Sequence, residues 1–285
     1  MSATARTSIG FIGGGNMGRA LIAALRRTGT DPATIFVAEP QETQRIELER
    51  DFQINVAAQA SSFIGEVDIV VLAVKPQDLP QVLAPLGATI AATRPLVISI
   101  AAGLSTAQLR KLCGDSVPIV RAMPNRPALV GAGATGLYAC ADVDAADRRC
   151  AESVLATAGM VVWVTDEALM DVVTAVSGSG PAYFFRLAEA LAAAGVAHGL
   201  DIDSARRLAA ATLHGAGQMA VEPVDLAALR LAVTSKGGTT AAALATFDAL
   251  RFDASVAAAV QAAIERGQEL AAELGKKEIE RCNRP

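Results

Sequence analysis

Residues 8–18 read Ser-Ile-Gly-Phe-Ile-Gly-Gly-Gly-Asn-Met-Gly, and this stretch decides the fold. Its first part, residues 8–12, is an apolar run that predicts a short strand. After the glycines, apolar side chains recur at helical spacing and predict a helix over residues 19–28, which ends at Gly29. A strand, a glycine-rich turn and a helix in this order are typical of an α/β fold that holds an anion at the helix start.

The glycines of this turn follow the spacing G-x-G-x-x-G, with Gly13, Gly15 and Gly18 at the three positions. The first glycine permits a tight turn and the second lets a pyrophosphate approach the backbone. The third lets the helix pack close to the strand. The pattern predicts dinucleotide binding, and the alternative is the same turn without a ligand.

The rest of the first half continues the alternation of strands and helices. Further strands are predicted at residues 34–38, 68–74, 96–101, 117–123, 134–139 and 160–165, and helices at 42–52 and 144–158. Such alternation indicates a mostly parallel sheet covered by helices. We therefore expect a Rossmann-like, doubly wound α/β domain over residues 1–165.

From residue 166 the strand pattern stops, and residues 166–285 are expected to form an all-helical domain. Helices are predicted at residues 166–176, 181–195, 202–221, 225–232, 240–250 and 254–274. The helix at 181–195 is apolar around most of its circumference, more than a domain of this size can bury alone. It predicts a subunit interface.

Cofactor contacts are expected where strands end. Glu39 ends the second strand, where a carboxylate would accept hydrogen bonds from ribose hydroxyls and repel a 2′-phosphate. This favours NAD(H), although Glu39 is as well explained by helix capping or solvent exposure, and Arg45 nearby could neutralise a phosphate. Lys75 follows the fourth strand as a cofactor contact or a solvent-facing lysine, and Ala101 and Ala102 leave room for a nicotinamide riboside.

Two further glycine-containing helix starts lie in the helical half, at residues 177–181 (Ser-Gly-Ser-Gly-Pro) and 233–240 (Val-Thr-Ser-Lys-Gly-Gly-Thr-Thr). Glycine inside a helix costs about 1 kcal/mol relative to alanine. Glycines that open a helix instead leave backbone N–H groups free to hold an anion. Three such starts suggest a phosphate-bearing cofactor and an acidic substrate.

The composition excludes several classes of protein. Of 285 residues, 52% are hydrophobic and 19% charged, which indicates a packed globular chain. The net charge of -4 argues against nucleic acid as a partner. There is no signal-peptide pattern and no apolar run near the about 20 residues that span a bilayer, so we expect a cytoplasmic protein without a membrane partner. The four cysteines and two histidines lack metal-ligand spacing, so no metal site is expected.

Five segments together resemble the pyrroline-5-carboxylate reductases. They are residues 12–18 (Ile-Gly-Gly-Gly-Asn-Met-Gly), 73–76 (Ala-Val-Lys-Pro), 123–125 (Met-Pro-Asn), 175–183 (Ala-Val-Ser-Gly-Ser-Gly-Pro-Ala-Tyr) and 233–240, in the family's order over nearly the whole chain. The resemblance implies a first domain that binds NAD(P)H and a helical domain that forms an intertwined dimer, often assembled into decamers. It places a small-molecule substrate between the domains.

The resemblance also assigns residues. The cofactor contacts it implies, beyond those above, are Ile12, Asn16, Met17, Ala73, Val74, Pro76, Met123 and Asn125. The substrate contacts are Ser177, Gly178, Ser179, Gly180, Ser235, Gly238, Thr239 and Thr240, of which the loop at 235–240 holds the substrate carboxylate. Where many members have proline, threonine and a turn suited to the NADPH phosphate, this chain has Lys236, Arg126 and Glu39-Pro40, and the last puts an NADPH preference in doubt.

The expected reaction is reduction of the cyclic imine 1-pyrroline-5-carboxylate to L-proline. An imine nitrogen is basic enough to be protonated before hydride arrives, so positioning and electrostatics suffice. Thr240 is the predicted catalytic residue, orienting the ring nitrogen. The alternatives are a hydroxyacid dehydrogenase, which would need Lys236 or Lys75 as a base, a related imine reductase, and a dinucleotide-sensing dimer without turnover.

Overall fold

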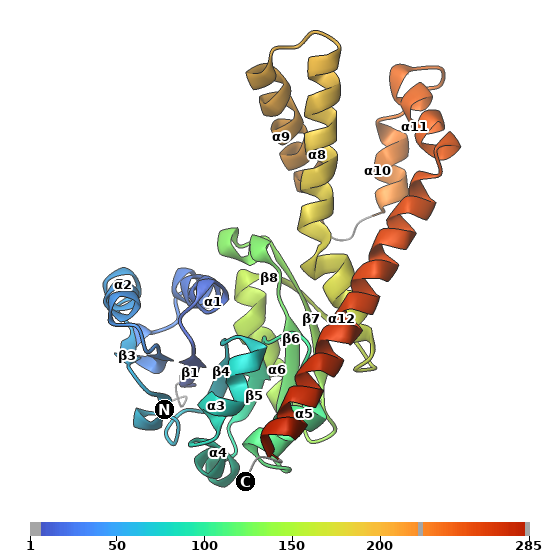
Figure 1. The fold of residues 1–285 in the computed structure, drawn as a ribbon. Coiled ribbons are helices and arrows are strands. Elements are labelled where there is room, and N and C mark those ends of the chain that lie inside the picture. The colour runs from blue at the N-terminus through green and yellow to red at the C-terminus, as the bar shows by residue number, and fades with distance from the viewer. Residues whose placement is uncertain (1–6, 222–224, 283–285) are drawn as a thin grey trace. The chain divides into compact units, whose positions relative to one another are not determined.

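The computed structural model describes residues 7–221 and 225–282, and the side chains of the last helix as far as Glu273. Eight strands and a series of helices follow one another along this part of the chain, and Figure 1 labels most of them. None of the described helices combines the length and apolar character that crossing a membrane requires.

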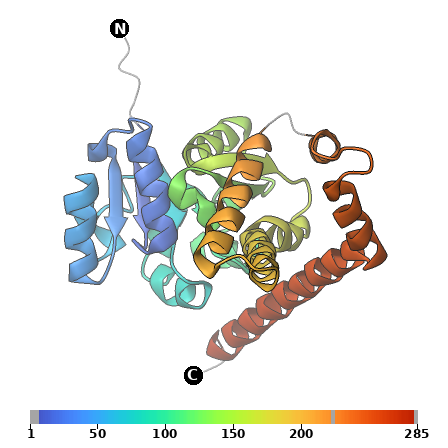
Figure 2. The ribbon, with the colours of Figure 1, turned by 90° about the horizontal axis from the view of Figure 1, so that it is seen from above.

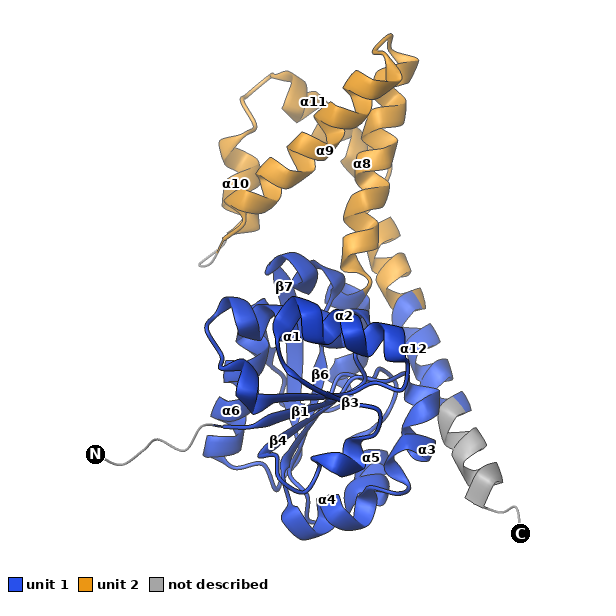
Figure 3. Ribbon diagram, turned by 90° about the vertical axis from the view of Figure 1, so that its left-hand side faces the viewer, with its two compact units in different colours: residues 1–178, 263–285 blue, residues 179–262 orange. Residues whose placement is uncertain are grey.

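The chain forms two compact units, shown in different colours in Figure 3. Unit 1 consists of residues 1–178 together with 263–285, and unit 2 of residues 179–262. The contacts thus divide the chain later than the boundary between the expected domains 1–165 and 166–285. They also group the end of the helical half with the sheet.

Unit 1 is built on an eight-stranded sheet with the order β3-β2-β1-β4-β5-β6-β7-β8. Neighbouring strands pair in parallel, except β6 and β7, which pair antiparallel. This is the Rossmann-like architecture that the alternating pattern predicts. The strands are β1 (Ile9–Ile12), β2 (Ile35–Ala38), β3 (Asn55–Ala57), β4 (Ile69–Leu72), β5 (Leu96–Ser99), β6 (Ile119–Met123), β7 (Gly133–Ala139) and β8 (Gly159–Trp163).

Helices cover both faces of this sheet. Helices α1, α2 and α6 form one group and α3, α4 and α5 another, on opposite sides of the strands in Figure 3. All residues of β1, β4 and β5 are therefore buried, as continuous apolar runs require. The helices are α1 (Asn16–Arg27), α2 (Glu42–Phe52), α3 (Leu79–Leu83), α4 (Gly87–Thr93), α5 (Thr106–Cys113) and α6 (Ala145–Leu155).

Two features of the sheet escape the sequence pattern. Strand β3 has only three residues and lies at the sheet edge, too short for a recognisable apolar run. Strand β7 turns antiparallel because only the short 3-10 segment η4 (Arg126–Val130) joins it to β6. A parallel partner needs a crossover of about a dozen residues or more.

The region predicted as one helix over residues 166–176 is a short helix followed by a wider turn. Helix α7 (Leu169–Val173) passes into the π-helical turn η6 (Thr174–Gly178), the last segment before unit 2 begins. Turns of this kind often occur at functional sites. Periodicity cannot distinguish them from an ordinary helix, because the apolar spacing is nearly the same.

Unit 2 contains only helices in its described residues. Helices α8 and α9 pack along each other. The long helix α12 is unbroken in Figure 2, although the division between the units falls within it. The helices are α8 (Gly180–Ala197), α9 (Ile202–Met219), α10 (Leu226–Ala232), α11 (Thr239–Ala249) and α12 (Phe252–Cys282).

Candidate cofactor and substrate sites

The glycine turn between β1 and α1 has the geometry that its spacing predicts. Gly13 adopts a φ of 103°, and a Cβ there would lie 2.8 Å from the carbonyl oxygen of Ala73. A Cβ on Gly18 would lie 2.6 Å from the carbonyl oxygen of Gly13. A Cβ on Gly15, in contrast, would meet no described atom within 4 Å. The first and third positions need glycine for close approach, and the second leaves open space in front of the helix.

That open space lies at an uncapped helix start. Gly15 is the N-cap of α1, and no described side chain bonds to the N–H groups of the first turn. These donors remain available to an anion, and the helix dipole favours negative charge there. The free N–H groups of this turn therefore suit the pyrophosphate of a dinucleotide.

A hollow of about 620 Å³ lies beside this turn, over the carboxyl ends of β1, β2, β3 and β4. Its lining is Ile12, Gly13, Ala38, Pro40, Ala58, Gln59, Ala60, Ser61, Val74, Asp78, Gln81, Val82, Pro85 and Leu86. In sheets of this type ligands bind at the carboxyl ends of the strands. The hollow is roomy and mostly apolar, as the adenosine half of a dinucleotide requires.

Glu39 lies against the glycine turn. Only 6% of the residue is exposed, and its carboxylate accepts the backbone N–H of Gly14 at 3.1 Å and that of Gln41 at 3.0 Å. The solvent-facing alternative is wrong for this side chain, because it is buried. Arg45 donates to the carbonyl oxygens of Glu39 and Pro40, at 2.9 and 2.7 Å.

A second hollow, of about 470 Å³, begins where β4 and β5 end. Pro76, Ala102 and Gly103 form part of its wall, so that the residues after β5 that line it are small. Its lining also includes Gln77, Asp171, Thr174, Gly267, Leu270 and Glu273. Lys75, which precedes Pro76, is exposed, and Ala101 is buried.

Asn125 joins two segments that the sequence predicts as parts of different sites. Its amide nitrogen donates to the carbonyl oxygen of Ser177 at 3.0 Å, and its amide oxygen accepts the N–H of Ala134 at 2.9 Å. A Cβ on Gly178 would lie 2.9 Å from Cε of Met123. The Met-Pro-Asn segment therefore packs against the π-helical turn, and Asn125 holds that turn in place.

The loop before α11 forms a tight turn that opens a helix. The N–H of Gly238 donates to the carbonyl oxygen of Ser235 at 3.0 Å, and Gly237 has a φ of 73°. Gly238 is the N-cap of α11, and no described side chain caps that end. The hydroxyl-bearing residues Ser235 and Thr239 are exposed and Thr240 is half-buried. The loop lies in unit 2, whereas the hollows above lie in unit 1.

Comparison with known proteins identifies the family. The profile of pyrroline-5-carboxylate reductase dimerisation matches residues 167–270, and that of coenzyme F420-dependent NADP oxidoreductase matches residues 8–103. A pyrroline-5-carboxylate reductase from Pseudomonas aeruginosa is 45% identical over 94% of this chain and 98% of its own length. The chain belongs to the pyrroline-5-carboxylate reductase family.

Solved structures agree with this assignment. The pyrroline-5-carboxylate reductase of Coxiella burnetii is 38% identical to this chain and superposes with a TM-score of 0.90, covering 93% of this chain and 98% of that one. A Plasmodium falciparum pyrroline carboxylate reductase with NADP bound is 28% identical, with a TM-score of 0.79, covering 94% and 100% of the two chains. This chain is accordingly an NAD(P)H-dependent oxidoreductase.

Sequence reasoning missed one polar cluster in this reductase. Glu167 accepts the N–H of Thr106 and the guanidinium of Arg121, both at 2.7 Å, and the Thr106 hydroxyl at 2.8 Å. It thereby ties the start of α5 to β6 and to the segment before α7. The partners lie 61 and 46 residues away along the chain, so that no local pattern could reveal them.

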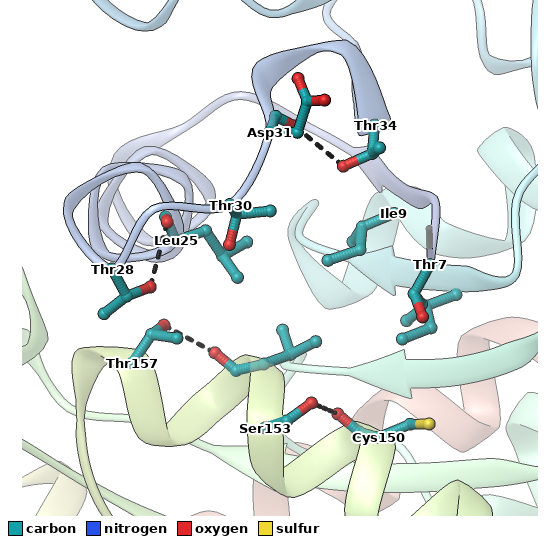
Figure 4. Close-up of a pocket in the computed structure, with 12 residues that line it drawn as sticks. Thr7, Ile9, Leu25, Thr28, Thr30, Asp31, Thr34, Cys150, Ser153 and Thr157 are labelled. Carbon is teal, nitrogen blue, oxygen red and sulfur yellow. Dashed lines mark hydrogen bonds between the residues drawn. The ribbon is translucent and has the colours of Figure 1, made fainter. Parts of the chain in front are cut away.

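The reductase also has a hollow of about 570 Å³ at the amino ends of β1, β2 and β4, drawn in Figure 4. Several of its hydroxyls already donate to backbone carbonyl oxygens, among them those of Thr28, Thr34, Ser153 and Thr157. The hollow lies away from the strand ends that hold the glycine turn and does not belong to the cofactor site. Among the described residues no three His, Cys, Asp or Glu side chains gather as a metal would require.

Proposed function

We propose that this chain reduces 1-pyrroline-5-carboxylate to L-proline with hydride from NAD(P)H, the last step of proline synthesis. The observation that carries the proposal is the uncapped start of α11 behind the Ser235–Gly238 turn, in a chain that belongs to this reductase family. An acidic substrate and a phosphate-bearing cofactor each find a helix start of suitable chemistry.

The cofactor is held mainly by backbone. The free N–H groups at the start of α1 bind the pyrophosphate, and the hollow beside Gly13 receives the adenosine. Ala102 and Gly103 admit the nicotinamide end, and Met123 and Asn125 keep the adjoining π-helical turn in position. When bound, the nicotinamide supplies the hydride that reduces the C=N carbon.

The substrate carboxylate is held by the first turn of α11. The N–H groups that follow Gly238 are unpaired with any described side chain and lie at the positive end of the helix dipole. The hydroxyls of Ser235 and Thr239 add donors beside them. Ser177, Gly178, Ser179 and Gly180 are proposed as further substrate contacts, and Gly180 and Pro181 open α8.

Thr240 orients the ring nitrogen. Its hydroxyl can donate a hydrogen bond to the nitrogen or accept one from the protonated imine. Because a cyclic imine is basic, the chain needs no strong acid at this point, and a single positioned hydroxyl suffices. A site without histidine or paired carboxylates in this loop is consistent with such chemistry.

The test is a cofactor-oxidation assay on the purified chain. Oxidation of NADH or NADPH on addition of pyrroline-5-carboxylate, with none on addition of 2-keto acids, is expected. Turnover of a 2-keto acid instead would favour the hydroxyacid dehydrogenase. Cofactor binding without turnover of either substrate would favour the sensing dimer.

A variant of Lys236 further distinguishes the reductase from the hydroxyacid dehydrogenase. This residue is exposed in the turn before α11, where many family members have proline, which cannot exchange protons. Lys236→Ala should keep the maximal rate within about tenfold, below the usual contribution of about 10²–10⁴ from a general acid or base. A larger loss of rate with an intact fold would favour the hydroxyacid dehydrogenase, in which Lys236 acts as a base.

We also propose that the homo-oligomer assembles beyond a dimer, up to a decamer, and that it works in the cytoplasm. The described cysteines Cys113, Cys140 and Cys150 are free thiols, which supports a reducing compartment. Light scattering on the purified chain measures the assembly. Detection of the tagged chain in the soluble fraction of its own cells, away from the envelope, tests the compartment.

A further inference from the structure

We propose that Glu39 makes this enzyme select NADH over NADPH. The inference deepens the proposed function, because it concerns the nucleotide that the same site binds. It depends on four observations: the fixed carboxylate, its place at the end of β2, the charge around the adenosine hollow, and the engagement of Arg45.

The Glu39 carboxylate is held by the glycine turn itself. One oxygen accepts the N–H of Gly14 and the other the N–H of Gln41, at 3.1 and 3.0 Å. A Cβ on Gly14 would come within 2.5 Å of the Leu48 side chain and 3.5 Å of the carboxylate. The lack of a side chain at Gly14 makes room for Leu48, and the carboxylate lies in ordinary van der Waals contact with the turn. It is a fixed charge with little freedom to move aside.

The charge lies at the end of β2, between two residues that line the adenosine hollow. Ala38 and Pro40, on either side of Glu39, line the adenosine hollow. In doubly wound folds an acidic residue at this strand end accepts hydrogen bonds from the ribose hydroxyls. A carboxylate has about four acceptor sites, of which two hold backbone N–H groups here. The remaining sites suit two hydroxyl donors.

The same carboxylate that suits ribose hydroxyls disfavours a 2′-phosphate. The phosphate replaces a hydroxyl donor by a group that only accepts and that carries negative charge, directly beside the buried carboxylate. The one charged side chain among the described residues that line the hollow is Asp78, which is also negative. Charge repulsion in a partly water-excluded hollow is stronger than in bulk water, so that the phosphate is disfavoured.

Arg45 is the candidate for compensation that the sequence suggests, and one nitrogen of its guanidinium, Nη1, is already engaged. The same nitrogen donates to the carbonyl oxygens of Glu39 and Pro40. Arg45 therefore braces the turn that carries Glu39. This arrangement fixes the backbone on both sides of the Glu39 side chain and leaves Nη1 occupied.

The experiment measures binding without turnover. Dissociation constants of NADH and NADPH are obtained by calorimetry or by nicotinamide fluorescence, with no imine present. The wild-type chain should bind NADH at least about tenfold more tightly, which corresponds to about 1.4 kcal/mol. Glu39→Gln, which removes the charge at similar size, should reduce that ratio by about tenfold or more. Glu39→Asp, which keeps the charge, should retain an NADH preference.

Two further variants sharpen the result. Glu42→Gln removes an exposed carboxylate three residues away, at the start of α2, and should leave the ratio unchanged. Arg45→Gln should weaken both nucleotides alike, because it loosens the turn. If Arg45→Gln weakened NADPH alone, the guanidinium would be a phosphate ligand and the proposal would be overturned.

Tighter binding of NADPH than of NADH by the wild-type chain would also overturn it, as would an unchanged ratio in a folded Glu39→Gln. The wild-type measurement stands even if Glu39→Gln fails to fold. Failure of the proposed function would appear differently, as absence of pyrroline-5-carboxylate reduction while the binding ratio holds.

Discussion

Thr240 is the residue on which the proposed chemistry depends most. Thr240→Val keeps the shape of the side chain and removes its hydrogen-bonding groups. If the hydroxyl acts mainly in the transition state, kcat and kcat/KM should fall together, by the low end of about 2–4 kcal/mol, with cofactor affinity unchanged. Steady-state kinetics and a binding titration measure both.

Thr246→Val is the matched control for that prediction, because Thr246 lies on the same helix with its exposed hydroxyl bonded to the carbonyl oxygen of Ala242. It should turn over at the wild-type rate. Wild-type turnover by Thr240→Val would instead show that the backbone of the loop does the positioning alone.

Cys113 gives the enzyme a stability component that depends on pH. Burial at the end of α5 raises the pKa of this thiol from its ordinary value of about 9 to about 12. The folded state favours the neutral thiol, so its contribution is complete below about pH 9 and is lost as the pH rises from 9 towards 12. Each pH unit in that window should cost about 1.4 kcal/mol.

Denaturant unfolding at pH 8 and at pH 10 measures this loss. Cys113→Ala should show a smaller difference between the two free energies of unfolding. Cys150→Ala, at a partly exposed cysteine, should keep the wild-type difference. Equal differences in all three proteins would mean that other groups account for the alkaline instability.

Among the secondary-structure elements, the π-helical turn η6 is held by a side chain from a distant segment, Asn125. Asn125→Ala should leave the carbonyl oxygen of Ser177 and the N–H of Ala134 without this partner in a buried place. The free energy of unfolding should fall by about 2 kcal/mol or more. Denaturant unfolding measures the loss.

Asn55→Ala serves as the comparison, since Asn55 bonds to backbone carbonyl oxygens of the neighbouring strand region but is exposed. Asn55→Ala should lower the free energy of unfolding clearly less than Asn125→Ala does. Equal losses would mean that water replaces the Asn125 contacts, and η6 would then have to be held by its own helix.

Elements with long apolar runs could be predicted from the sequence, and those defined by their partners could not. Strands β1, β4 and β5 are buried along their whole length, so their composition identifies them. The direction of β7 depends on its short link to β6, and the existence of β3 as a strand depends on its pairing with β2. No local sequence pattern records either relation.

The same distinction holds for the candidate site. The glycine turn was predictable because backbone conformation and close approach demand glycine at Gly13 and Gly18. The anchoring of Glu39 by Gly14, 25 residues away, was not predictable, because it is a contact between two elements. The burial of that carboxylate excludes the solvent-facing alternative, and its contact with a ribose stays a prediction.

For the whole assembly, we expect the subunit interface to lie on the helical unit. On α8 the residues Phe184, Leu187 and Leu191 lie on one face and are 60%, 38% and 48% exposed in the single chain. The match to the dimerisation family indicates that a second copy covers apolar surface of this unit. Leu187→Asp combined with Leu191→Asp should shift the chain to monomers in light scattering.

Arg186→Gln is the control on the same helix, because its side chain is 81% exposed and pairs only loosely with Glu189. It should leave the oligomer intact. An unchanged mass for the double variant would place the subunit interface on another face.

Unit 1 is encoded in two pieces, with the whole of unit 2 between them. Synthesis runs from the amino end, so a ribosome releases all eight strands before it makes residues 263–273. Until then the newborn sheet lacks the helix segment whose Leu270 closes one wall of the second hollow. Since domains fold as they emerge, this enzyme must complete its first unit last. A chain halted during translation would have the whole glycine turn but an incomplete unit 1. We expect such a chain to bind chaperones.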